Sequence, residues 1–302
     1  MSEVEVMNEK LMLDVLSVPS YTGQEHRMME FLVAHAAEKG YQCETDSKGN
    51  VYLRKGKVAE GSFYPCLTAH MDTVQSSQIP YIQKGEPLPL IMEEREGQHV
   101  VYTEGFGLGG DDKAGIAVAL SIMERVPVCK AAFFVEEETG CHGSMEANLA
   151  WFKDVGYVIA FDAPGWNCAS WACSGIALFG KDFYETYLEE LGPKFGLTNF
   201  HYHPYTDVTA LRLRTNLVCM NFGAGYHHYH TSREYCVIEE MQQSVNTGIY
   251  LIDRLGQNKY VAPKVPDTRI SETEDHKYFR TRFRQCQTYA LPLQRQNHNT
   301  TI

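Results

Sequence analysis

Two adjacent carboxylates, Asp111 and Asp112, follow a glycine-rich run at residues 105–110. Glycine adopts backbone angles that other residues avoid, so such a loop can fold tightly around a small ligand. Two neighbouring aspartates repel each other unless a cation lies beside them. The pair alone is not specific, because a metal ion at Asp111 needs further ligands from other parts of the chain.

Further residues of the types that bind metals follow short apolar runs elsewhere, or lie in a histidine-rich loop. They are His70 and Asp72, Glu137 and Glu138, Asp162, and His230. Short apolar runs are typical of strands buried in a mixed or parallel sheet. The ends of such strands meet at one edge of the sheet, so we expect these side chains to lie together. Imidazole and carboxylate groups suit zinc, and cobalt or manganese can replace it.

The spacing of apolar residues indicates the elements that would position these side chains. It predicts helices at about residues 4–18, 24–39, 113–123, 145–152, 183–195 and 241–255. It predicts strands at about residues 41–45, 51–54, 65–69, 99–103, 131–135, 157–161 and 217–222. Residues 75–97 are polar and rich in proline and glycine, and we expect them to run over the surface. The repeated order of strand, polar cluster and helix predicts a three-layer α/β/α fold with a mixed, mostly parallel central sheet.

Five motifs in this order resemble the co-catalytic di-zinc peptidase superfamily. Peptidase T, carboxypeptidase G, acetylornithine deacetylase and the aminoacylases belong to that superfamily. The motifs are His70-Met71-Asp72-Thr73, Gly110-Asp111-Asp112-Lys113-Ala114-Gly115, Glu137-Glu138-Thr139-Gly140, Phe161-Asp162-Ala163 and His230-Thr231-Ser232-Arg233-Glu234-Tyr235. The resemblance covers about residues 8 to 255. It implies a zinc-exopeptidase-like fold and a cis peptide bond between Asp111 and Asp112.

The resemblance also implies two Zn²⁺ ions per chain, which Co²⁺ or Mn²⁺ can replace. The implied ligands are His70, Asp111, Glu138, Asp162 and His230. Asp111 would bridge the two ions. His70 and Asp162 would complete one site, whereas Glu138 and His230 would complete the other.

Two further residues receive catalytic roles from the resemblance. Glu137 would be the general base that takes a proton from the attacking water and delivers it to the leaving amine. Asp72 would orient His70, because residues two apart in an extended chain point the same way.

Two assignments involve a choice between neighbours. Three glutamates stand in a row at residues 136–138, and a Glu-Glu pair with glycine two residues later selects Glu137 and Glu138. His230 competes with His227 and His228, and the residues that follow His230 match the superfamily's pattern best.

The interval between Asp162 and His230 is short. Strands and helices of the central sheet would use roughly 50–60 residues of it. Peptidase T-like enzymes insert a lid domain here that supports dimerisation and supplies substrate-binding residues. We therefore expect that this lid is lacking and that no lid-mediated dimer forms.

The composition changes after residue 258. The remaining residues include Pro263 and Pro266 and show no sustained periodicity. We expect residues 1–258 to form a single catalytic domain, and residues 259–302 to form a C-terminal tail that is extended or partly disordered.

The composition limits the partners and the compartment. The formal net charge of −11 argues against binding to nucleic acid or to anionic membranes. The nine cysteines are scattered, which indicates free thiols in a reducing compartment. The chain begins with an acidic segment without a hydrophobic signal region, and no apolar run reaches membrane-spanning length. We expect a cytoplasmic protein.

The sequence therefore predicts a di-metal hydrolase that cleaves short peptides, an exopeptidase and preferably an aminopeptidase. One alternative is a deacylase or carboxypeptidase acting on N-acyl amino acids or peptides with a free carboxylate. Such a site needs an arginine, for which Arg212 and Arg214 are candidates. A non-catalytic metal-binding relative is a further alternative, which the complete set of ligands together with Glu137 disfavours.

Overall fold

The computed structural model describes residues 8–197, 199–203, 206–264 and 274–282. Nine strands form the central sheet, in the order β1-β2-β6-β3-β7-β11-β8-β10, with β9 paired to β8. Their bounds are β1 (Gln42–Thr45), β2 (Val51–Lys55), β3 (Tyr64–His70), β6 (Cys129–Phe134), β7 (Val155–Ala160), β8 (Cys168–Cys173), β9 (Ile176–Ala177), β10 (Asn199–His203) and β11 (Cys219–Phe222).

The four middle strands β6, β3, β7 and β11 are parallel, whereas β1, β2 and the contact of β11 with β8 are antiparallel. Every residue of β3, β6 and β7 is buried. This explains why these strands read as continuous apolar runs, since both faces of a covered parallel sheet are dry.

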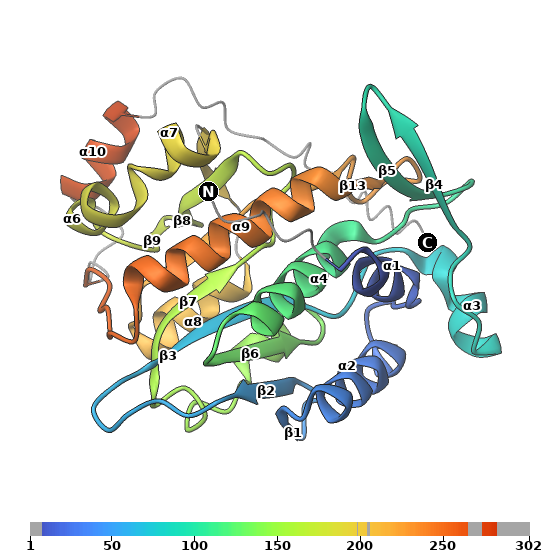
Figure 1. Cartoon of the computed structure of the whole chain (residues 1–302), viewed down its shortest axis with the longest axis horizontal. Coiled ribbons are helices and arrows are strands. Elements are labelled where there is room, and N and C mark those ends of the chain that lie inside the picture. The colour runs from blue at the N-terminus through green and yellow to red at the C-terminus, as the bar shows by residue number, and fades with distance from the viewer. Residues whose placement is uncertain (1–7, 198, 204–205, 265–273, 283–302) are drawn as a thin grey trace, which may run out of the picture.

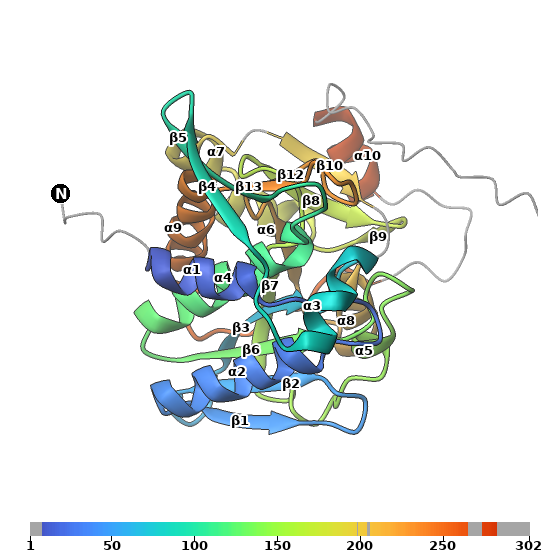
Figure 2. The same cartoon turned by 90° about the vertical axis from the view of Figure 1, so that its right-hand side faces the viewer.

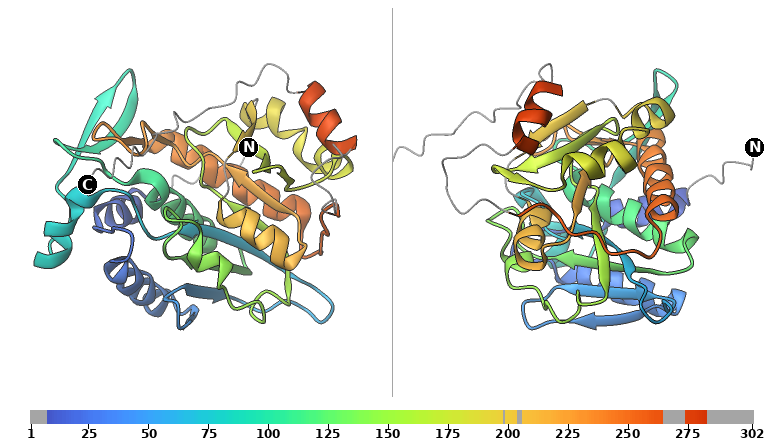
Figure 3. Two further views of the ribbon diagram at one scale, coloured as in Figure 1. Left: turned by 180° about the vertical axis from the view of Figure 1, so that it is seen from behind. Right: turned by 90° about the vertical axis from the view of Figure 1, so that its left-hand side faces the viewer.

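Helices cover both faces of this sheet. They are α1 (Glu9–Ser17), α2 (His26–Lys39), α4 (Gly110–Arg125), α5 (His142–Met145), α8 (Asp207–Thr215) and α9 (Ile238–Leu255). Helix α4 packs on β3 and β6 with α1 and α9 beside it, and α8 packs on β3, β7 and β11 from the opposite side (Figure 2). The view from behind shows α8 in front of the sheet (Figure 3). The predicted three-layer α/β/α fold with a mixed sheet is confirmed.

A second sheet, antiparallel and four-stranded, lies at the edge where the motifs meet. Its order is β12-β13-β5-β4, with β4 (Leu90–Arg95), β5 (Gln98–Thr103), β12 (Tyr226–His227) and β13 (Tyr235–Val237). The β4–β5 hairpin stands out from the body of the molecule (Figure 1). The stretch at residues 75–97 runs over the surface as expected, and it contains η1 (Ser76–Gln78), α3 (Ile79–Lys84) and β4.

The interval between Asp162 and His230 contributes mainly to the central sheet. Its described strands β8, β9, β10 and β11 join that sheet, and the two-residue strand β12 joins the second sheet. The helix expected at residues 183–195 is divided into η2 (Tyr184–Leu188) and α7 (Leu191–Phe195), after the short helix α6 (Lys181–Phe183).

Helix α10 (Glu274–Arg282) lies in the segment for which we expected an extended or partly disordered tail. It is anchored by Phe279, whose ring is buried and lies 5.2 Å from that of Trp171 and 5.7 Å from that of Tyr184. Most residues of this helix are charged or polar, so the sequence carries little sign of it. The helix lies beside α6 at the outer edge of the molecule, red in Figure 1. Residues 265–273 and 283–302 lie outside the described residues, and the domain boundary at residue 258 stays a prediction.

Among the described residues, no helix is both long enough and apolar enough to cross a membrane.

Candidate metal centre

Asp111 occupies the start of α4, where the backbone is not yet helical. The peptide bond between Asp111 and Asp112 is cis, as the resemblance implies. The two carboxylate oxygens of Asp111 face different histidines. Oδ1 lies 3.2 Å from His70 Nε2, and Oδ2 lies 3.2 Å from His230 Nε2. One carboxylate thus stands between two imidazoles, which is the placement that a bridging ligand needs.

Each histidine also faces a second carboxylate. His70 Nε2 lies 3.7 Å from Asp162 Oδ1, and His230 Nε2 lies 2.9 Å from Glu138 Oε1. The structure therefore brings together all five side chains for which the sequence predicts metal ligation. Their donor set of imidazole nitrogens and carboxylate oxygens is chemically suited to zinc.

Asp112 also lies close to these groups. One ring nitrogen of His70, one carboxylate oxygen of Asp112 and one of Asp162 all lie within 4.8 Å of one another. The side chain of Asp112, however, accepts backbone N–H groups: Oδ1 accepts from Gly115 at 3.0 Å and Oδ2 from His70 at 3.3 Å. Asp112 is fully buried, and burial raises its pKa well above the usual range. These contacts favour a structural role for Asp112.

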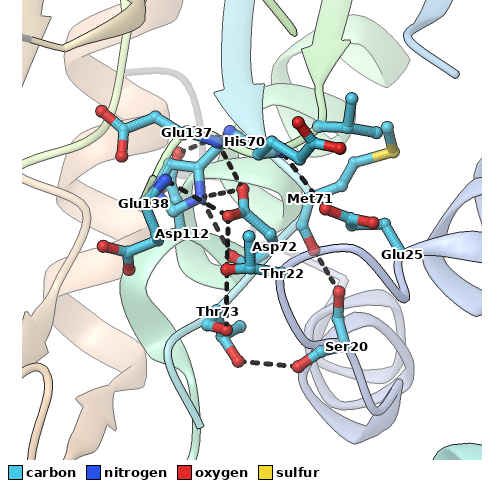
Figure 4. Close-up of polar contacts among 12 residues, drawn as sticks. Ser20, Thr22, Glu25, His70, Met71, Asp72, Thr73, Asp112, Glu137 and Glu138 are labelled. Atoms are coloured by element: carbon cyan, nitrogen blue, oxygen red, sulfur yellow. Dashed lines mark hydrogen bonds and ion pairs between the residues drawn. The ribbon is translucent and has the colours of Figure 1, made fainter. Parts of the chain in front are cut away.

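Asp72 lies behind His70, on the side away from Asp111. His70 Nδ1 is 3.0 Å from the backbone oxygen of Asp72 and 3.3 Å from its Oδ1. The same carboxylate accepts the backbone N–H of Glu137 at 2.9 Å and of Glu138 at 3.2 Å, and the hydroxyl of Thr22 at 2.8 Å. Figure 4 shows Asp72 among these partners. The sequence predicts the contact with His70 but not the contacts with the glutamate loop.

The loop between α1 and α2 supports the end of β3 in the same network. Ser20 Oγ donates to the backbone oxygen of Met71, and Thr73 Oγ1 donates to the backbone oxygen of Ser20 at 2.7 Å. Glu25 accepts the backbone N–H of Glu136 at 3.2 Å. The strand that carries His70 and the loop that carries the glutamates are therefore held by one common segment.

Glu137 and Glu136 have different surroundings. Glu137 accepts a hydrogen bond from Cys141 Sγ at 3.2 Å. Burial raises the pKa of Glu137 to about 8, and the negative charges of Asp207 and Glu138 act in the same direction. The carboxylate of Glu136 instead forms an ion pair with Lys48 at 2.9 Å.

The carboxylates around the two histidines favour positive charge at this centre. Burial opposes the charged form of both imidazoles, but the carboxylates of Asp111 and Asp72 raise the pKa of His70 well above its usual range. Asp111 and Glu138 raise the pKa of His230 to about 10. Burial raises the pKa of Asp162 well above the usual value.

Comparisons with known proteins bear on the fold and on part of the sequence. No family model matches the sequence. The cytosol non-specific dipeptidase of Escherichia coli (strain K12) is 28% identical over 171 residues, which cover 55% of this chain and 32% of the relative. The matched part thus spans about a third of that relative's length.

Solved structures of peptidases share the fold. The aminopeptidase PepT of Bacillus cereus ATCC 10987 has a TM-score of 0.64 at 16% identity, covering 82% of this chain and 99% of that one. A tripeptidase of Staphylococcus aureus has a TM-score of 0.63 at 16% identity, and the match covers 83% of this chain and 100% of the tripeptidase chain. The chain therefore has the fold of these peptidases, and the order of its motifs resembles that of the zinc peptidase superfamily. At these identities the likeness to the solved structures concerns the fold.

Two buried carboxylates near the candidate metal centre, Glu234 and Asp207, received no role from the sequence. Glu234 is buried, and its carboxylate accepts the backbone N–H of Asp111 at 3.0 Å and of Gly109 at 2.6 Å. Burial raises the pKa of Glu234 to about 7. Its position four residues after His230 is part of the motif that carries the resemblance, so a signal was present in the sequence.

Asp207 is the other such residue. It begins α8 and is buried, and neither of its carboxylate oxygens has a hydrogen-bond partner among the described residues. Burial raises its pKa to about 7, although the nearby charge of His70 acts in the opposite direction. A single aspartate between polar residues gives no sequence signal that it will be buried near the site.

Proposed function

We propose that this chain is a metal-dependent exopeptidase that hydrolyses short peptides, preferably from a free N-terminus. The observation that carries the proposal is the position of Asp111 between His70 and His230, with Glu137 on the loop beside it. The relatives and structural neighbours described above are named as a dipeptidase, an aminopeptidase and a tripeptidase, which supports peptides as the substrate class.

The proposed cofactor is a pair of Zn²⁺ ions, with Co²⁺ or Mn²⁺ as functional substitutes. His70, Asp111 and Asp162 would hold one ion, and Asp111, Glu138 and His230 would hold the other. When bound, such ions lower the pKa of water toward about 7 and polarise the scissile carbonyl.

The protein's own residues would then move the proton. Glu137 accepts it from the attacking water and returns it to the leaving amine, because a carboxylate with a raised pKa can both take and give a proton near neutral pH. Cys141 holds one oxygen of Glu137, and Asp72 holds the backbone of the glutamate loop and the imidazole of His70. The chemistry thus depends on a base whose position is fixed from two sides.

The carboxypeptidase and deacylase alternatives receive less support from the structure. Arg214 donates to the backbone oxygens of Ser144 and Ala147, at 2.6 and 3.2 Å. Arg212 is buried and donates to the backbone oxygens of Ala177 and Pro263. Both arginines that could have bound a substrate carboxylate therefore bind carbonyl groups of the protein itself.

The remaining sequence predictions enter the proposal unchanged. We propose a cytoplasmic enzyme that binds neither nucleic acid nor membranes and forms no lid-mediated dimer. The described cysteines support a reducing compartment, because all eight are free thiols.

The proposal is tested with metal-loaded protein on free short peptides, N-blocked peptides and N-acyl amino acids. We expect cleavage of the free peptides. Glu137→Ala should lower kcat about 10²–10⁴-fold while metal content stays at the wild-type level, because general base catalysis contributes that much.

The matched control is Glu136→Ala, which removes the adjacent glutamate that pairs with Lys48 and should leave kcat unchanged. Cleavage of blocked but not free peptides would replace the aminopeptidase by a deacylase. A Glu137→Ala protein with full activity would exclude the proposed mechanism.

A further inference from the structure

Glu234 is a buried carboxylate that lies at the junction of three ligand-bearing segments. Its residue is 1% exposed, and among the described residues no salt bridge involves it. The positive charge of the buried Lys113 acts on Glu234 but forms no ion pair with it, so the hydrogen bonds of the carboxylate must offset most of the loss of water. The partners that it has therefore indicate what it does.

The first partners are backbone groups around Asp111. Oε1 accepts the N–H of Asp111 at 3.0 Å, and Oε2 accepts the N–H of Gly109 at 2.6 Å. Gly109 is the N-cap residue of α4 and has no side chain of its own to cap the helix. Glu234 thus supplies from a distant loop the acceptor that the first backbone N–H groups of a helix require.

A close fit leaves this loop little freedom to move. Gly109 has a left-handed backbone with φ of 71°, and a Cβ there would lie 2.7 Å from Thr73 Cγ2. A Cβ on Gly110 would lie 3.0 Å from Tyr226 Cβ. The backbone that leads into Asp111 is therefore held by close packing as well as by Glu234.

The second and third segments meet at the same carboxylate. Gln75, which follows the strand end that carries His70, donates from Nε2 to Glu234 Oε2 at 3.2 Å. Glu234 itself belongs to the loop of His230, whose Nε2 lies 3.2 Å from Asp111 Oδ2. One side chain thereby joins the segment of the first histidine, the bridging aspartate and the loop of the second histidine.

We propose that Glu234 is a positioning residue that couples the two metal sites by fixing the bridging carboxylate of Asp111 relative to the loop of His230. This inference rests on the metal centre of the proposed function. With Glu234 in place, the carboxylate of Asp111 would already be oriented for the second metal site when the first site is filled. Without it, binding of the second ion must first order the loop, so the second ion binds more weakly.

Glu234→Gln tests this role with almost no change in volume. Glutamine has one acceptor oxygen where glutamate has two, so at least one of the N–H groups of Gly109 and Asp111 loses its acceptor. We expect the affinity for the second ion to fall about 10–100-fold, the range that loss of such outer contacts produces. Calorimetric titration of metal-free protein with Zn²⁺ measures both binding steps, and the visible spectrum of the Co²⁺ form reports the coordination geometry.

The matched control is Glu240→Gln. Glu240 is a glutamate near the same loop, and its Oε2 lies 2.6 Å from His227 Nε2 without a hydrogen bond to the segment of Asp111. Its replacement should leave the titration and the Co²⁺ spectrum as in the wild type. Glu234→Asp keeps two acceptor oxygens on a shorter side chain and should restore part of the lost affinity.

A capping role without coupling predicts a different result. In that case Glu234→Gln lowers the urea stability of the metal-free protein but leaves both the second binding step and the Co²⁺ spectrum unchanged, and the proposal is overturned. If Glu234→Gln does not fold, Gln75→Met removes the donor to Oε2 together with its longer contact with the backbone oxygen of Thr231, in the same loop. A smaller but measurable loss of second-ion affinity is then expected, and an unchanged titration overturns the proposal.

The titration needs no substrate, so the two proposals can fail separately. A wild-type protein that binds two ions but cleaves no peptide contradicts the proposed function alone. A Glu234→Gln protein that binds both ions like the wild type contradicts the coupling role alone.

Discussion

Two buried aspartates near the centre illustrate how hydrogen bonding decides the ionisation of a carboxylate. Asp72 is fully buried, yet its contacts with His70, Glu137 and Thr22 outweigh burial and keep its pKa below the usual value. Asp207 is nearly as buried and has no hydrogen bond among the described residues, so burial raises its pKa to about 7. The same side chain is therefore charged in one place and titrates near neutral pH in the other.

The raised pKa of Asp207 predicts a pH dependence of stability. An unfolded aspartate has a pKa of about 3.9. Between about pH 4 and pH 7 the folded state therefore binds more protons at Asp207 than the unfolded state, and this group lowers the free energy of unfolding as pH rises. Asp207→Asn removes the group, so the unfolding free energy of metal-free protein should fall less between pH 4 and pH 7 than in the wild type.

Urea unfolding in the presence of a chelator measures this difference. Asp14→Asn is the control, because Asp14 forms a solvent-exposed ion pair with Lys10 on α1 and its replacement should change the slope little. If Asp207→Asn and the wild type show the same slope, the carboxylate of Asp207 is not held in a buried environment without hydrogen-bond partners.

At the scale of secondary structure elements, close contact between α4 and α9 limits what their facing residues can be. Gly248 of α9 faces α4, and a Cβ there would lie well inside contact distance of Ile122 Cδ1 and 2.9 Å from Phe161 Cζ. Gly248→Ala should gain about 1 kcal/mol of helix propensity but lose about 1–3 kcal/mol to overpacking. We therefore expect a net decrease in the free energy of unfolding, measured in urea.

The control for this prediction is another glycine in a helix. A Cβ on Gly192 of α7 would meet its nearest neighbour, the backbone oxygen of Leu197, at 3.4 Å. Gly192→Ala should therefore be neutral or stabilising. Equal destabilisation by both replacements would show that the helix backbone, and not the α4–α9 contact, is responsible.

The elements differ in how far the sequence could predict them. Strands β3, β6 and β7 are buried on both faces, so their apolar runs and the polar residues at their ends are visible in the sequence. Strand β4 begins with three apolar residues and ends with three charged ones, and it is mostly exposed, so its pairing with β5 leaves no alternating pattern in the sequence. The contact of Glu234 with Asp111 joins residues far apart in the chain, and spacing along the sequence carries no information about such contacts.

At the scale of the whole molecule, a net charge of −11 and a buried cluster of carboxylates predict that stability depends on divalent cations. An ion that binds only the folded state adds about 2.7 kcal/mol when its concentration is 100 times its Kd. In a domain of this size each kcal/mol raises Tm by roughly 2–4 °C. Chelation should thus lower Tm by roughly 5–10 °C, and added Zn²⁺ should restore it.

Two variants locate the origin of this effect in a thermal unfolding experiment. Asp111→Asn removes the negative charge that lies 3.2 Å from both His70 and His230, so most of the Tm increase with Zn²⁺ should disappear. Glu137→Ala leaves the proposed ligands in place and should keep the full increase while activity is lost. If Asp111→Asn responded to Zn²⁺ like the wild type, the stabilising ions would bind elsewhere. The separate effects of the two variants therefore distinguish residues that hold cations from the residue that moves the proton.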